Sequence, residues 1–212
     1  MSGEAHTSSV GVVHGNPYDK YGTRNPIARR LMAGFDREMF GLLHQVGPVG
    51  SVLEVGCGEG HVTAKLHQFF PDASVTGSDV SPEIVDAARG FHPELTFEVR
   101  SVYEEGARGE RFDLVVACEV FEHLDEPERA LEVLARVSRQ WIFLSVPREP
   151  IWRVLNLARG QYVSRLGNSL GHVQHWSRGG FVQMLSRHVD VVGVRSPLPW
   201  TQALCRVRGT KA

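Results

Sequence analysis

The feature that most constrains the fold is an alternation of short β-rich segments with helical segments from residue 51 onward. The β-rich segments are dominated by Val, Leu and Phe, and helix signals lie between most of them. This alternation requires a mostly parallel sheet covered by helices on both faces, which is a doubly wound α/β fold. The expected strands are residues 51–55, 73–79, 95–99, 112–118, 141–147, 189–194 and 203–207. Ligands of such sheets bind beyond the carboxyl ends of the strands, so a site is expected there.

Helix-start signals place the helices between these strands. Ser81 is typical of an N-cap residue and Pro82 of a first helical position, so a helix is expected at 82–90. Apolar residues at helical spacing indicate further helices. These are expected at 26–46, at 61–70, from Pro127 onward and after Ser177.

The chain is expected to form one domain, residues 26–212, preceded by a leader. Residues 1–25 are polar and rich in small residues, which predicts a flexible leader or a lid over the site. Residues 148–176 are long for a connection and are expected to form a small cap insertion. No apolar run is long enough to cross a membrane, and three widely spaced cysteines favour reduced thiols and a cytoplasmic protein. No feature of the sequence indicates an oligomeric state.

A glycine-rich loop follows the first strand. Gly56, Gly58 and Gly60 let the backbone turn sharply and approach a ligand closely, and the acid Glu54 precedes them. The dinucleotide fingerprint Gly-x-Gly-x-x-Gly would need its third glycine one residue later, where His61 stands. The spacing therefore argues against a nicotinamide site.

The loop resembles motif I of the class I S-adenosylmethionine (SAM)-dependent methyltransferases, E/D-x-G-x-G-x-G. The resemblance is firm over residues 50–147 and implies a seven-stranded, Rossmann-like methyltransferase fold that binds SAM. It implies that Glu54 contacts the methionine portion, that Asp79 accepts hydrogen bonds from the ribose and that Val80 packs on adenine. Ser101 departs from the family, which often has Asp at this position. The expected cofactor-binding residues are Glu54, Gly56, Cys57, Gly58, Gly60, Asp79, Val80, Ser101, Val102 and Cys118.

Acidic and imidazole side chains cluster after the fourth strand. Glu119, Glu122 and His123 stand at i, i+3 and i+4, so one helical turn would bring them to the same face. Two carboxylates and an imidazole suit a hard divalent cation. A hydroxyl acceptor has to lose its proton during methyl transfer, which a metal or a base can promote.

This segment resembles the E-x-x-E-H of the ubiquinone-biosynthesis O-methyltransferases and of the small-RNA 2′-O-methyltransferases. The latter carry a later His four residues before a Trp, as His172 precedes Trp176 here. The resemblance implies Mg²⁺ or Mn²⁺ bound by Glu119, Glu122, His123 and His172, and an acceptor with two adjacent oxygens. The alternative is a metal-free site, like that of many methyltransferases, in which His123, His172 or His175 acts as the base. The expected catalytic residues are His123, Glu119 and His175.

Charge is distributed unevenly along a chain whose net charge is -1. Residues 146–212 carry ten Lys and Arg against two Asp and Glu, which is typical of a solvated basic face or of a surface that meets an anionic acceptor. No RNA-binding module or basic-aromatic stripe is present, which disfavours a nucleic-acid partner. The leading hypothesis is O-methylation of a small hydroxylated metabolite. The alternatives are methylation of an RNA end, and a SAM-binding or nicotinamide-dependent protein without methyl transfer.

Overall fold

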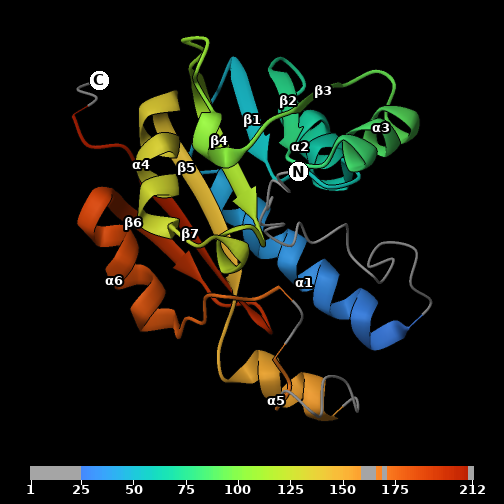
Figure 1. Ribbon diagram of the computed structural model, residues 1–212, viewed down its shortest axis with the longest axis vertical. Coiled ribbons are helices and arrows are strands. Elements are labelled where there is room, and N and C mark those ends of the chain that lie inside the picture. The colour runs from blue at the N-terminus through green and yellow to red at the C-terminus, as the bar shows by residue number, and fades with distance from the viewer. Residues whose placement is uncertain (1–24, 159–165, 169–170, 210–212) are drawn as a thin grey trace, which may run out of the picture.

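The computed structural model describes residues 25–158, 166–168 and 171–209, so the predicted leader lies outside it except for Asn25. The described residues form a seven-stranded sheet in the order β3-β2-β1-β4-β5-β7-β6 (Figure 1). Strands β1 to β5 are parallel, and β7 runs antiparallel to both β5 and β6. The expected fold class is confirmed. The strands are β1 Ser51–Val55, β2 Ser74–Asp79, β3 Thr96–Val99, β4 Phe112–Cys118, β5 Ser138–Pro147, β6 Asp190–Arg195 and β7 Trp200–Arg206.

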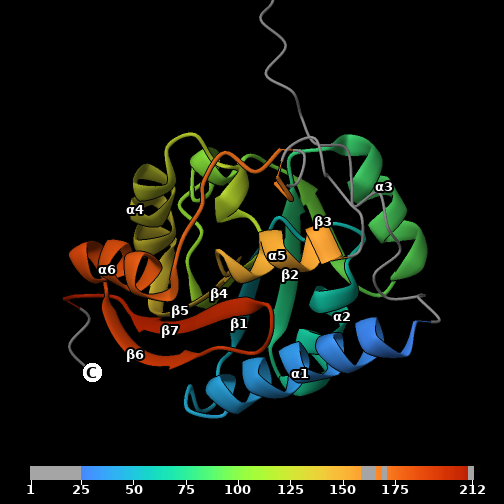
Figure 2. The ribbon, with the colours of Figure 1, turned by 90° about the horizontal axis from the view of Figure 1, so that it is seen from below.

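The helices cover both faces of the sheet (Figure 2). One core lies between the sheet and helices α4 and α6, and the other lies between the sheet and helices α1 and α2. Buried strand residues such as Leu114 and Val115 point alternately into the two cores, as expected for strands covered on both sides. The helices are α1 Pro26–Leu43, α2 His61–Phe69, α3 Pro82–Phe91, α4 Pro127–Val137, α5 Ile151–Ala158 and α6 Arg178–His188, with 3-10 turns η1 Val102–Glu104 and η2 Phe121–His123.

Local sequence signals set the starts of several helices. Ser81 caps α3 by accepting a hydrogen bond from the Ile84 amide, and Ser177 caps α6 in the same way from the Gly180 amide. Asn25 caps α1 by accepting from the Ile27 amide. Each cap satisfies a backbone donor that the helix itself leaves without a partner. Both predicted caps are therefore confirmed.

The segment between β5 and α6 contains α5, a helix that the sequence analysis did not predict. Its eight residues are too few to establish a helical period, although Arg153 and Asn156 stand at the i, i+3 spacing of one helical face. The two ends of the segment meet: Arg148 forms a parallel bridge with Trp176, and the Glu149 amide donates to the Trp176 carbonyl. Helix α5 thus projects from a closed base next to the carboxyl edge of the sheet (Figure 1). Its role as a cap over a substrate stays a prediction.

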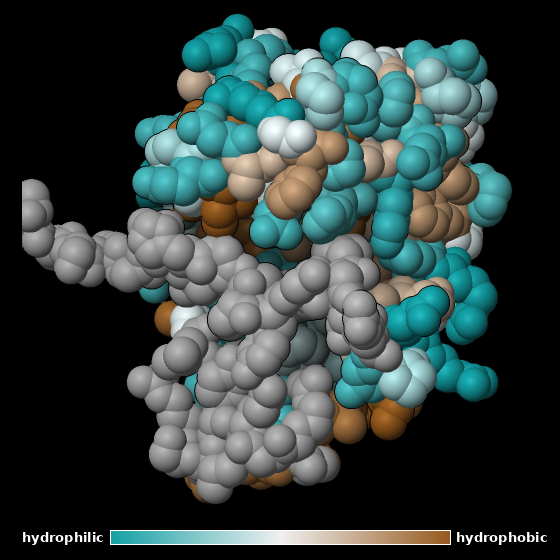
Figure 3. All heavy atoms as spheres, turned by 90° about the vertical axis from the view of Figure 1, so that its right-hand side faces the viewer, coloured by the Kyte–Doolittle hydropathy of each residue, from teal (hydrophilic) through white to brown (hydrophobic). Residues whose placement is uncertain are grey.

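The surface around α3 is largely hydrophilic, with apolar groups exposed in small patches between polar ones (Figure 3). Phe91 at the end of α3 is 60% exposed and Val80 before it is 54% exposed. Across the described part of the chain, we find no helix with the length and apolarity needed to cross a bilayer.

The junction of β1 and α2 requires glycine at position 60. Gly60 has φ +82, and a Cβ there would lie 2.7 Å from Cζ of Phe97, whereas a Cβ on Gly34 in α1 would meet no atom within 4 Å. We expect Gly60→Ala to lower the free energy of unfolding by about 1–3 kcal/mol through backbone strain and overpacking. The matched Gly34→Ala should raise it by up to about 1 kcal/mol because alanine favours helix. Urea denaturation measures both, and equal effects of the two substitutions would contradict this account.

Candidate active site

The glycine loop between β1 and α2 forms the floor of the site. Gly56, Gly58 and Gly60 all have left-handed backbone, with φ of +68, +55 and +82. A Cβ on Gly56 would collide with the Val120 side chain, and one on Gly60 would collide with Phe97, so both glycines are required by packing. Among the described residues, a Cβ on Gly58 would meet no atom within 4 Å. Gly58 is therefore where the backbone lies open to a ligand.

Asp79 lies beside this open backbone at the carboxyl end of β2. Its Oδ2 accepts a hydrogen bond from the Gly58 amide at 3.1 Å, and its Oδ1 accepts one from the Ser81 amide at 3.1 Å. These bonds hold the carboxylate in one orientation, and each oxygen keeps a further lone pair for a donor such as a ribose hydroxyl. Val80 is 54% exposed, so it does not pack in the core.

Ser101 and Val102, which were expected on the adenine side of the site, agree less well with the prediction. Ser101 Oγ accepts a hydrogen bond from the Tyr103 amide at 3.3 Å and so caps η1. Val102 is buried in the core beside α4. Both residues thus have structural tasks, and their contact with a cofactor stays a prediction.

Glu54 is a buried carboxyl group at the end of β1. It is 2% exposed, and the Thr63 hydroxyl on α2 donates to its Oε2 at 2.5 Å. Burial raises the pKa of Glu54 to about 8, while the hydrogen bond from Thr63 lowers it and the Asp79 charge raises it. A cationic ligand placed against this carboxyl would favour its ionised form.

The two cysteines of the expected cofactor set are unreactive. Cys57 packs against Val85, Ala88 and Phe97, and burial raises the pKa of its thiol. Burial also raises the pKa of the Cys118 thiol well above its ordinary value. Neither thiol is disposed to form a nucleophilic thiolate.

Asp36 on α1 is a partly buried acid that the sequence analysis did not single out. Its carboxylate pairs with Lys65 of α2 at 2.7 Å, and its charge contributes to the raised pKa of the Cys118 thiol, as do those of Glu54 and Glu119. The charges of acids on three different parts of the chain thus act on the thiol at the end of β4. Periodicity within α1 gives no signal for this role, because only the packing of α1 on the sheet brings Asp36 there.

A candidate metal centre lies beyond β4. Glu122, His123 and His172 each offer a ligand atom, and these atoms all lie within 4.8 Å of one another. The segment carrying His172 is held against η2 because the Glu122 carbonyl accepts hydrogen bonds from the Val173 and Gln174 amides at 2.9 and 3.0 Å. Three of the four predicted ligands are thus together.

The imidazole rings of this centre are held by their neighbours. His123 Nδ1 lies 2.9 Å from the Gly171 carbonyl oxygen, a contact that requires Nδ1 to be the donor and gives Nε2 the lone pair. The His172 ring packs edge-on against His123 at 5.0 Å and stacks on Trp152 of α5 at 6.0 Å. Such outer contacts orient metal-binding imidazoles in known sites.

Glu119 is not part of this cluster. The expected convergence at i, i+3 and i+4 needed an α-helical turn starting at Glu119. Instead Glu119 has φ +57, its amide donates to the Ser145 carbonyl, and the following turn is a 3-10 turn that begins at Phe121. Glu119 and Glu122 therefore do not share one helical face.

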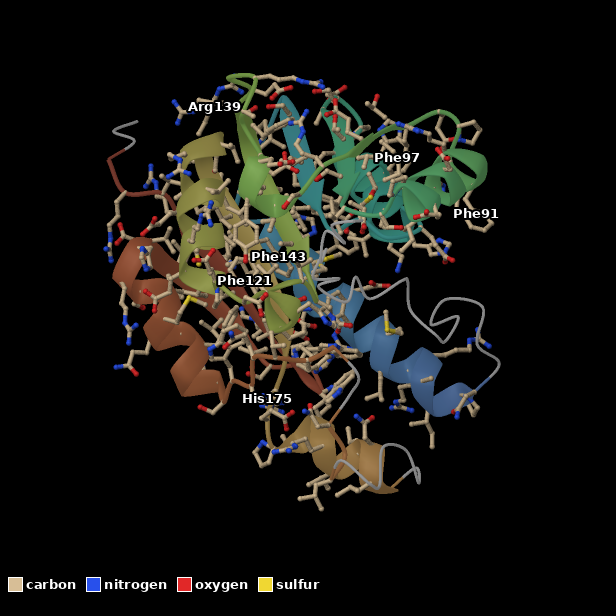
Figure 4. The ribbon with its side chains drawn as sticks, viewed as in Figure 1. Phe91, Phe97, Phe121, Arg139, Phe143 and His175 are labelled. Atoms are coloured by element: carbon tan, nitrogen blue, oxygen red, sulfur yellow. The ribbon has the colours of Figure 1, made fainter. Side chains whose placement is uncertain are left out.

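His175 also lies apart from the cluster, beside α5 (Figure 4). Its Nε2 lies 2.7 Å from Asn168 Oδ1, and its charge lowers the pKa of Glu149, which burial raises overall. These contacts join the base of α5 to the returning segment. A catalytic role for His175 stays a prediction that no contact with the cluster supports.

Comparison with proteins of known structure agrees with the fold. Magnesium protoporphyrin IX methyltransferase from Synechocystis, with bound SAH, superposes with a TM-score of 0.66 at 18% identity, covering 87% of this chain and 89% of that one. The plantazolicin methyltransferase BpumL superposes with a TM-score of 0.64 at 14% identity, covering 86% and 91%. The fold is thus that of class I methyltransferases.

Comparison of sequences gives the family. A model described as "Methyltransferase domain" matches residues 52–140. Trans-aconitate 2-methyltransferase of Shigella dysenteriae is 30% identical over 179 residues, covering 72% of this chain and 69% of that protein. Ubiquinone biosynthesis O-methyltransferase of Candida albicans is 33% identical over 127 residues, covering 55% and 38%. The chain belongs to the SAM-dependent methyltransferase family. It spans little more than a third of the length of two curated relatives, 38% of the Candida albicans protein and 36% of a malonyl-[acyl-carrier protein] O-methyltransferase.

The buried Glu54 carboxyl makes the stability of the ligand-free protein depend on pH. Because the folded-state pKa of about 8 exceeds the ordinary value of 4.5, the folded protein holds a proton that the unfolded chain releases between these values. The free energy of unfolding should therefore fall as the pH rises from 4.5 to about 8, and level off above. Over this pH window, the free energy of unfolding of the wild type should fall by on the order of a few kcal/mol relative to that of Glu54→Gln.

Urea denaturation of both proteins across this pH range measures the effect, and Glu104→Gln, which alters an exposed carboxyl group, is the control. Parallel pH profiles for wild type and Glu54→Gln would disprove the role assigned to burial.

Proposed function

We propose that this chain transfers the methyl group of SAM to an oxygen atom of a small hydroxylated metabolite, with help from a divalent cation. The observation that carries the proposal is the cluster of Glu122, His123 and His172 at the same sheet edge as the open glycine loop and Asp79. The residues proposed for cofactor binding and those proposed for proton handling thus lie at the carboxyl ends of neighbouring strands, where ligands of doubly wound sheets bind.

The loop residues fit SAM. Asp79 would accept hydrogen bonds from the ribose, the open Gly58 backbone would lie along the cofactor, and the exposed Val80 side chain would lie against adenine. Glu54 would ionise against the positively charged methionine portion. When bound, SAM supplies a methyl group activated by its sulfonium. Asp79 and Glu54 bind and orient it, which supplies much of the rate of an in-line displacement.

The cluster fits a divalent cation with open coordination positions. One carboxylate and two imidazoles are a ligand set that favours Mn²⁺, Fe²⁺ or Zn²⁺ over Mg²⁺. When bound, the cation lowers the pKa of an acceptor hydroxyl and orients it. Glu122, His123 and His172 would hold it, with His123 presenting Nε2 because Nδ1 donates to the Gly171 carbonyl.

Two observations bear on the choice of acceptor. Two relatives bear the name O-methyltransferase, those of ubiquinone biosynthesis and of malonyl-[acyl-carrier protein]. Arg187 and Arg208 of the basic C-terminal third are engaged with Glu128 and Asp190, which reduces the positive surface left for an RNA phosphate backbone. A small acceptor is favoured over an RNA end.

The second candidate is the same reaction without metal, with His123 or His172 as the base. The contact of His172 with both Trp152 and His123 favours it as much as it favours the metal, because a catalytic imidazole also needs a fixed orientation. Metal binding separates the two.

Asp79→Asn should weaken SAM binding at least about tenfold, a loss of about 1.4 kcal/mol, because one strong acceptor for the ribose is replaced by a donor. Calorimetric titration of SAM measures this. Asp72→Asn on the exposed turn before β2 is the control and should bind SAM like the wild type. Equal affinities of the two variants would remove Asp79 from the cofactor site.

His172→Ala should weaken Mn²⁺ binding at least about tenfold, as loss of a ligand does, and leave SAM binding unchanged. Glu119→Gln should retain Mn²⁺ binding, because Glu119 lies outside the cluster. Electron paramagnetic resonance of free Mn²⁺ during titration measures both variants. Wild-type protein that binds no Mn²⁺, yet stays fully active after chelation, would refute the metal and leave the histidine base.

A further inference from the structure

Helix α5 exposes apolar side chains and buries a polar one. Val154 is 59% exposed and Leu157, one turn further on, is 39% exposed, whereas Asn156 is 1% exposed and donates a hydrogen bond to the Gly167 carbonyl at 2.9 Å. Leu166, next to Gly167, is 72% exposed. A helix whose outer face meets only water has the opposite pattern. Val154, Leu157 and Leu166, here called the α5 patch, therefore mark a surface that contacts a partner.

The sequence around the α5 patch carries positive charge without negative charge. Residues 150–189 contain five arginines and no Asp or Glu, although the whole chain has 24 acids among 212 residues. Exposed apolar side chains within an arginine-containing, acid-free stretch are typical of segments that lie on an anionic membrane surface.

Arginines also stand at the starts of two helices. Arg29 lies in the first turn of α1 with Arg30 directly after it, and Arg178 is the first residue of α6. All three are exposed, neither first turn contains an acid, and no ion pair joins them to an acid within the described residues. Because positive charge at a helix N-terminus opposes the helix dipole, these arginines do not stabilise their own helices.

The topology brings these helix starts to the end of the molecule from which α5 projects. Strand β6 is parallel to β5, because both are antiparallel to β7. Helix α1 leads into β1 and helix α6 leads into β6, so both helices begin at the carboxyl edge of the sheet. Figure 1 shows the starts of α1 and α6 at the same end of the molecule as α5. The α5 patch and the exposed arginines thus belong to one end of the protein.

We infer that this end of the molecule docks on an anionic lipid bilayer, with the α5 patch among the headgroups and the arginines against the lipid phosphates. The inference does not depend on the proposed reaction. It has a consequence for the candidate metal centre, because α5 also carries Trp152, whose ring stacks on His172. Docking places that centre next to the bilayer.

Charge and apolarity together favour a bilayer over other partners. In a symmetric contact between two copies of the chain, the arginines of both copies would come together, and like charges repel. A nucleic acid would match the arginines through its phosphates but would leave the aliphatic side chains of the α5 patch without a partner. An anionic bilayer matches both features.

The test is co-sedimentation of the full chain with lipid vesicles. Vesicles of phosphatidylglycerol should bind the protein, and vesicles of phosphatidylcholine should bind it at least about tenfold more weakly. Val154→Asp should weaken binding to phosphatidylglycerol at least about tenfold, because it places a negative charge within the α5 patch. Val192→Asp makes the same substitution at a side chain that is 48% exposed on the edge strand β6, and it should bind like the wild type.

A charge reversal tests the arginines separately. Arg178→Glu should weaken binding to phosphatidylglycerol at least about fivefold, which is the contribution of one positive charge near an anionic surface. An acid at this position favours α6 through the helix dipole, so the loss does not arise from unfolding. Arg136→Glu, at an exposed position in the last turn of α4 and so at the opposite edge of the sheet, should bind like the wild type.

Several outcomes would overturn the inference. They are equal binding to the two lipids, binding to neither, and wild-type binding by Val154→Asp or by Arg178→Glu. Sedimentation velocity without lipid tests the second copy of the chain. A dimer that Val154→Asp dissociates would assign the α5 patch to that copy and overturn the docking on a bilayer.

Discussion

The whole site depends on the reversal of strand order at β1. Strand β1 pairs with β2 on one side and with β4 on the other, so the connections that leave these strands turn in opposite directions. This edge of the sheet carries Gly58 from the loop after β1, Asp79 from the end of β2, and η2 from beyond β4. A parallel sheet brings these carboxyl ends together whatever side chains they carry, and the side chains then decide the chemistry.

A buried acid at this point is costly for the ligand-free protein and useful once a cation binds. Glu54 lies near the end of a mostly buried strand, and the described hydrogen bonds to its carboxyl group come from Thr63. Burial favours its neutral form, so the folded protein holds a proton there at neutral pH. A positively charged ligand would instead favour the ionised form of Glu54. Burial of Glu54 thus lowers the stability of the ligand-free protein, and the same carboxyl group would interact most favourably with a cationic cofactor.

The sequence predicted what depends on local pattern, and it missed what depends on packing between distant segments. Ser81, Asp79 and the glycines follow from caps, strand ends and turn geometry, each encoded within a few residues. Asp36 pairs with Lys65 only because α1 packs back on the sheet beside α2. Glu119 leaves the cluster because its backbone adopts φ +57, which a spacing argument based on a helix does not anticipate. Helix α5 is too short for its periodicity to reveal it in the sequence.

The acceptor side of the site depends on packing between segments that are distant in the sequence. His172 is 49 positions beyond His123 in the sequence, and it reaches the cluster because the closed base of the α5 segment returns the chain to η2. That base contains Trp152, so one short insertion carries a proposed ligand and the ring that orients it. The residues proposed to bind the cofactor lie on other elements. Changes within the insertion can therefore alter the acceptor without altering how SAM is bound, which is how one fold serves many methyl acceptors.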